Sequence, residues 1–110
     1  MERLKRGDIV SVALQGDFGK PKPAVVVQSD LFSEHATVTV LPVTSTLLEA
    51  PLLRLDLESD AENGLKKTSQ IMVDKIMTIR RVKVGQRIGA VSEEQLLQIS
   101  RSLALFLGIV

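Results

Sequence analysis

Turn residues divide the chain into short segments, and this division limits the folds that the chain can adopt. Segments rich in Val, Ile, Thr and Leu alternate with turns that contain Gly, Pro or Asn-Gly, as is typical of short strands. No helical repeat separates them, so the strand–helix alternation of a Rossmann or P-loop fold is excluded. We expect an α+β fold that is mostly β, a small antiparallel barrel or sandwich with strands at 8–14, 24–28, 37–43, 52–57, 68–74, 76–79 and 87–91.

The last part of the chain has the pattern of one amphipathic helix. Ser92 and Gln95 have the spacing of a capping box, and apolar residues follow at helical spacing: Leu96, Ile99, Leu103, Phe106 and Leu107. Residues 103–110 are apolar nearly all round, more than one small barrel covers, which predicts a homodimer. A chain of 110 residues has room for one core, so we expect a single domain over 1–110.

The composition excludes several kinds of chemistry. The chain has no Cys and only one His, His35, which excludes thiolate zinc sites, His clusters and Cys nucleophiles; we expect no metal and no cofactor. Its only aromatic residues are three Phe, too few for the stacking platforms of RRM and OB modules. The net charge is +1, so any nucleic-acid site has to be a local basic patch. Neither a signal-peptide pattern nor an apolar run approaching ~20 residues occurs, which predicts a cytoplasmic protein that does not contact membranes.

Two loop regions could carry chemistry. Residues 19–23 hold two lysines, each followed by a proline that stiffens the loop, which suits phosphate contact; the alternative is a solvated turn whose lysines keep an edge strand soluble. Residues 41–46 end a strand with three adjacent hydroxyls, which could project into a cleft or simply bond their own backbone.

A third candidate stretch is 69–75. The period of a strand places Gln70, Met72 and Asp74 on one face, while Asp74 and Lys75 could also be no more than an exposed ion pair. His35 follows an acidic residue in a polar loop, and we expect it at the surface without a catalytic role.

The order of these pieces resembles the MazF/PemK family of bacterial toxins over nearly the whole chain. The matching motifs come in the family's order: Arg6-Gly7-Asp8-Ile9-Val10, Lys20-Pro21-Lys22-Pro23, Pro42-Val43-Thr44-Ser45, Asp74-Lys75-Ile76-Met77-Thr78-Ile79, Arg87-Ile88-Gly89-Ala90-Val91 and Leu107-Gly108. The resemblance implies a compact SH3-like barrel (MazF/CcdB-like) with a C-terminal helix, working as a homodimer whose groove takes single-stranded RNA. It also implies a toxin–antitoxin system, in which the C-terminal tail of a cognate antitoxin fills that groove.

The activity implied by the resemblance is metal-independent, sequence-specific cleavage of single-stranded mRNA. The RNA 2′-OH attacks the adjacent phosphorus, which leaves a 2′,3′-cyclic phosphate and a 5′-OH, and DNA lacks that nucleophile. By position in the family motifs, Lys22 and Thr44 are the implied catalytic residues. The implied RNA-binding residues are Asp17, Phe18, Lys20, Ser45, Gln70, Asp74 and Lys75.

Lys22 departs from the family pattern, which has Arg at this place. Arg grips two phosphate oxygens with a planar fork, whereas Lys is a point charge on a flexible stem, so we expect an attenuated enzyme. The alternative function is a binding toxin of the same fold, resembling CcdB, which acts on gyrase through its C-terminal helix and has no nuclease chemistry.

Overall fold

A computed structural model describes residues 3–13 and 20–109, which form seven strands and one α-helix. The strands are β1 (Asp8–Ala13), β2 (Pro21–Val26), β3 (Thr37–Thr44), β4 (Arg54–Leu57), β5 (Ser69–Met72), β6 (Met77–Arg80) and β7 (Val84–Ala90). The 3-10 turns η1 (Asp30–Phe32), η2 (Val73–Lys75) and η3 (Arg81–Lys83) lie between strands, and the helix α1 (Glu93–Leu107) ends the chain.

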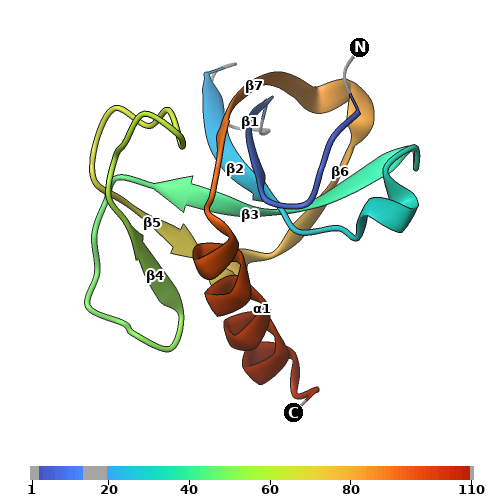
Figure 1. The fold of residues 1–110 in the computed structure, drawn as a ribbon. Helices are drawn as coiled ribbons and strands as arrows, with labels where there is room; N and C mark the ends of the chain where they lie inside the picture. Colours follow the sequence, from blue (N-terminus) through green and yellow to red (C-terminus); the bar gives the residue numbers. More distant parts are fainter. Residues whose placement is uncertain (1–2, 14–19, 110) are drawn as a thin grey trace.

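Strand β3 connects the two parts of an antiparallel sheet (Figure 1). One edge of β3 pairs with β2, and the sheet continues through β1 to β7. The other edge pairs with β6 over Thr37–Val40 and with β5 over Val43–Thr44, and β4 lies beyond β5. Strands β6 and β7 are not paired with each other within the part of the chain that the structure describes, so the barrel is open.

The two faces of the sheet carry two separate cores. One core, which we call the barrel core, consists of Val10, Val12, Ala24, Val26, Val38 and Val40. Because these residues come from three neighbouring strands and pack together on one face, the sheet curves around them. The opposite face packs Ile9, Val25 and Leu41 against Ile99 and Leu103 of α1. The prediction of a mostly β, α+β fold with one C-terminal helix is confirmed.

The apolar run in β2 explains why this strand lies inside the sheet. Ala24 and Val26 enter the barrel core, while Val25 and Val27 enter the helix-facing core, so all four are buried. The strand predicted at 24–28 is present, although β2 begins at Pro21 and ends at Val26. Pro21 and Pro23 pair with Ala13 and Ser11 of β1.

The bounds of β4, β5 and β7 also differ from the predicted ones. Asp74 lies in η2 rather than on the strand with Gln70, because β5 ends at Met72. Strand β4 begins at Arg54 because a turn precedes it, and β7 begins at Val84 rather than at Arg87.

The helix α1 has the predicted capping box. The Ser92 side chain accepts from the backbone N–H of Gln95, and the Gln95 side chain accepts from the backbone N–H of Ser92. Gly108 ends the helix with a positive φ of 73°, where L side chains are strained.

Candidate functional site

Lys22 extends from the first part of β2. It pairs with Val12 of β1 and lies two residues before Ala24, so strand alternation directs its side chain to the face of the sheet that carries the barrel core. Ala24 is fully buried, whereas Lys22 and Lys20 are exposed. The prediction of a basic stretch is therefore correct, but Lys22 lies on a paired strand instead of in a loop.

The register of β2 and β3 brings Lys22 and Thr44 to the same end of the sheet. Ala24 and Pro42 form the end pair of β2 and β3, and Lys22 and Thr44 each lie two residues beyond that pair, on the same side of it. Both residues then share one face, because each is two residues from a directly paired neighbour. Ser45 follows Thr44 and is exposed.

The Thr44 side chain also organises the turn after β3. Its Oγ1 accepts from the backbone N–H of Thr46 at 3.1 Å, a local turn bond that restricts the hydroxyl orientation. Thr44 is partly buried and Ser45 exposed, so this end of β3 presents hydroxyls to solvent beside the exposed Lys22.

Gln70 holds the segment after β3 from the inside. Its Nε2 donates to the Leu48 carbonyl oxygen at 2.9 Å, and its Oε1 accepts from the Leu48 N–H at 3.0 Å. Arg54 donates to the same Oε1 at 3.1 Å and to the Thr46 carbonyl oxygen at 3.1 Å, while Asp56 accepts from Gln70 Nε2 at 3.0 Å. Gln70 is only 6% exposed and its amide is bonded within the protein, so this geometry favours a positioning role over direct RNA contact.

The sequence reasoning missed Arg54 and Asp56. The pairing of β4 with β5 would have pointed to them. Asp56 pairs directly with Gln70, so an acceptor and a donor face each other across the two strands. That signal depends on knowing the register.

Asp74 and Lys75 lie away from the Lys22 end of the sheet. They belong to η2, beside the middle of β3 on the edge opposite β2, and their side chains form an ion pair of 3.6 Å. The Lys75 side chain is 62% exposed, so screening by water makes the pair weak.

The remaining predictions concern Asp17, Phe18, His35, metal binding and membrane contact. Asp17 and Phe18 lie outside the described residues. His35 is exposed, with its ring edge-on to Phe32, which confirms the predicted surface position. Within residues 3–13 and 20–109, no three His, Asp or Glu side chains are grouped to hold a metal ion, and no helix there is long and apolar enough to cross a membrane.

Comparisons with known proteins agree with this fold over almost the whole chain. A family model described as "PemK-like, MazF-like toxin of type II toxin-antitoxin system" matches residues 5–107. The "Probable endoribonuclease MazF" of Mycolicibacterium smegmatis is 39% identical over 107 residues, which cover 96% of this chain and 98% of that relative. "Endoribonuclease EndoA" of Bacillus subtilis is 21% identical over 112 residues and 97% of both chains.

Solved structures of similar fold include the Mycobacterium tuberculosis toxin MazF-mt6, with a TM-score of 0.79, 22% identity and coverage of 92% of this chain and 96% of that one. The Deinococcus radiodurans MazF has a TM-score of 0.80 at 17% identity, over 98% and 99% of the two chains. These matches put the chain in the class of small toxins from type II toxin–antitoxin systems. Within that class, it belongs to the PemK-like, MazF-like family.

Proposed function

We propose that this toxin cleaves single-stranded mRNA at specific sequences without a metal ion, and that Lys22 and Thr44 are its catalytic residues. Its activity class is endoribonuclease, in line with its family and with the 39% identical relative of that name. The observation that supports the residue assignment is the register of β2 and β3, since Lys22 and Thr44 both lie just beyond its end pair, Ala24 and Pro42.

The chemistry needs a cation and oriented hydroxyls at one phosphate. The 2′ oxygen of the RNA bonds to phosphorus while the bond from phosphorus to the 5′ oxygen breaks, so a 2′-OH proton is lost and the leaving 5′ oxygen gains one. Negative charge accumulates on the phosphorus oxygens in between. The Lys22 ammonium stabilises that charge, and the Thr44 hydroxyl, held by its bond with Thr46, donates to the same group.

RNA cleavage in EDTA by the unmodified chain, by Lys22→Arg and by Lys22→Ala tests this proposal, with the 5′ ends of the products mapped. Arg provides a bidentate grip, so we expect Lys22→Arg to cleave faster than the unmodified chain; removal of the charge should slow cleavage about 10²–10³-fold. Lys67→Ala removes another exposed lysine and serves as the control. Cleavage by neither the unmodified chain nor Lys22→Arg would contradict the nuclease proposal.

The same proposal includes the partners. A homodimer is supported by exposed apolar residues in and just after the last turn of α1. They include Leu105, which is 54% exposed, and Ile109, which is 73% exposed. Lys20 and Lys22 favour an acidic antitoxin tail as the tight partner at the RNA groove, and a largely electrostatic contact weakens at about 0.5 M salt. We place the protein in the cytoplasm, where mRNA and a newly made antitoxin are available.

A further inference from the structure

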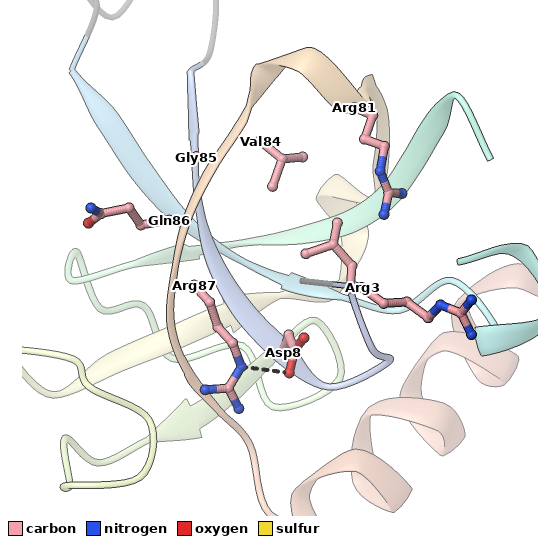
Figure 2. A pocket seen from close by; sticks show the side chains of 8 residues that line it. Arg3, Asp8, Arg81, Val84, Gly85, Gln86 and Arg87 are labelled. Atoms are coloured by element: carbon pink, nitrogen blue, oxygen red, sulfur yellow. Dashed lines mark hydrogen bonds and ion pairs between the residues drawn. The ribbon is translucent and has the colours of Figure 1, made fainter. Parts of the chain in front are cut away.

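A pocket of about 200 Å³ lies beside β7 (Figure 2), and neither Lys22 nor Thr44 lines it. Its walls come from opposite ends of the chain: Arg3, Leu4 and Asp8 precede or begin β1, and Arg81, Val84 and Arg87 belong to η3 and β7. We call it the arginine pocket. Leu4 and Val84 also pack against the barrel core, so the base of the pocket is fixed by the fold.

A β-bulge aims two residues of β7 at this pocket. Val12 pairs with Val84 and Val10 pairs with Arg87, so two steps along β1 correspond to three steps along β7. In a regular strand, residues three apart point to opposite faces; the extra residue lets Val84 and Arg87 line the same pocket. Gly85 is part of the bulge and passes so close to Ser11 that a Cβ there would lie 2.5 Å from the Ser11 hydroxyl oxygen.

The pocket has more positive than negative charge. Among the described residues that line it, Asp8 is the one carboxylate. Its side chain is 7% exposed and accepts from Arg87 Nε at 3.1 Å and from the Lys5 N–H at 2.9 Å. Arg3 pairs with Glu34 at 3.0 Å at the rim. Arg81 has no carboxylate partner among the described residues, and its side chain makes only a 3.4 Å bond to the His35 carbonyl oxygen.

The arginine pocket lies in the same row of residues as Lys22. Val12 pairs with Lys22 on β2 and with Val84 on β7, so these three residues lie side by side across three strands and on one face. Neighbouring strands are about 4.8 Å apart, which puts the two outer positions roughly 10 Å apart. A short single-stranded RNA segment can therefore contact both Lys22 and the arginine pocket beside Val84.

We propose that the arginine pocket binds a backbone phosphate of the single-stranded RNA whose scissile phosphate lies at Lys22. This inference rests on the proposed nuclease function and adds a subsite to it. Arg81 supplies the charge that is not already neutralised, and Arg87, held by Asp8, stays on the pocket side. Phosphate contacts of this kind fix the register of the nucleic acid and read no base, so they complement a sequence-specific site elsewhere.

The test uses a mixed-sequence, single-stranded 2′-O-methyl oligonucleotide, which lacks the free 2′-OH and is not cleaved, so binding is measured without catalysis. We expect Arg81→Gln to weaken binding about tenfold and to lower the slope of log affinity against log salt by about 0.7, the value for one phosphate contact on a single strand. Arg81→Lys should restore most of the slope. Arg80→Gln is the matched control, since it removes the same charge from the neighbouring exposed residue, which does not line the pocket.

The same proteins are also tested on unmodified RNA in EDTA. If the unmodified chain cleaves this RNA but Arg81→Gln binds the oligonucleotide with the affinity and salt slope of Arg80→Gln, the phosphate subsite is wrong and the nuclease proposal stands. If the unmodified chain neither binds nor cleaves, the nuclease proposal fails and the subsite fails with it. If it binds but does not cleave, and only Arg81→Gln weakens binding, the phosphate subsite stands without the catalysis.

Discussion

Replacing Gln70 by Leu tests whether the buried amide holds the segment after Thr44, whose hydroxyl we propose to be catalytic. Leu has a similar size but makes no hydrogen bonds, so the N–H and the carbonyl of Leu48 both lose their partner, as do Arg54 and Asp56. Leu48 is 55% exposed, so water replaces part of these bonds. We therefore expect a cost of about 1–3 kcal/mol, concentrated in the turn after β3.

Three measurements follow from this estimate. The Leu48 amide should exchange its hydrogen about tenfold faster or more, since 1.4 kcal/mol corresponds to a factor of ten. The free energy of unfolding should fall by a similar amount in denaturant titrations. RNA cleavage should lose kcat with little change in KM, because the Thr44 hydroxyl, and not the basic surface, is the part that is loosened.

Gln98→Leu is the matched control, since it makes the same chemical change at an exposed position of α1. It should leave both the exchange rate and kcat unchanged. If Gln70→Leu keeps the protection of the Leu48 amide, Gln70 does not hold the turn. If protection is lost but kcat is not, the turn is held by Gln70 but does not position a catalytic group.

Three further predictions concern the fold and the assembly. Gly89→Ala should lower the free energy of unfolding by about 1–3 kcal/mol in denaturant, because a Cβ there would lie 2.5 Å from the Asn63 carbonyl group; an unchanged midpoint would refute this. Ser92→Ala should cost about 1 kcal/mol by thermal unfolding, since it removes half of the capping box, and a loss below a few tenths would count against the cap. Leu105→Glu should convert a dimer into a 12.0 kDa monomer in light scattering, whereas Leu31→Glu, exposed on η1, should not; a Leu105→Glu protein that remains dimeric would place the interface elsewhere.

The fold class was predictable because the local signals agree with the tertiary structure. Alternation and β-branched runs predicted the strands, and Ser92 and Gln95 predicted the helix start, which the capping box confirms. The start of β2 was not predictable, because Pro21 and Pro23 are strong turn signals. The two prolines are tolerated because this part of β2 pairs only with β1, while pairing with β3 begins at Ala24. The edge of β2 that faces β3 therefore needs no N–H donor at Pro21 and Pro23.

The sequence could propose site residues but not their arrangement. A sequence resemblance points to Lys22 and Thr44, and their positions relative to each other depend on the register between β2 and β3, which no local pattern encodes. Gln70 was predicted to bind RNA, whereas its side chain is buried and bonded within the protein. The arginine pocket was not predicted at all, since its walls are some 80 positions apart in the chain and a bulge determines which of the β7 side chains face it.

The pairing of β1 with β7 has a consequence for the order of folding. Asp8 pairs with Ala90, so β1 completes its pairing only when β7 is present. Contacts between residues so far apart in the sequence slow the folding of β proteins. During synthesis, residues 8–13 have only β2 as a partner until 84–90 have been made. The sheet face that carries Lys22 and the arginine pocket is therefore complete only after residues 84–90 have been made, so a partly made chain without them lacks this surface.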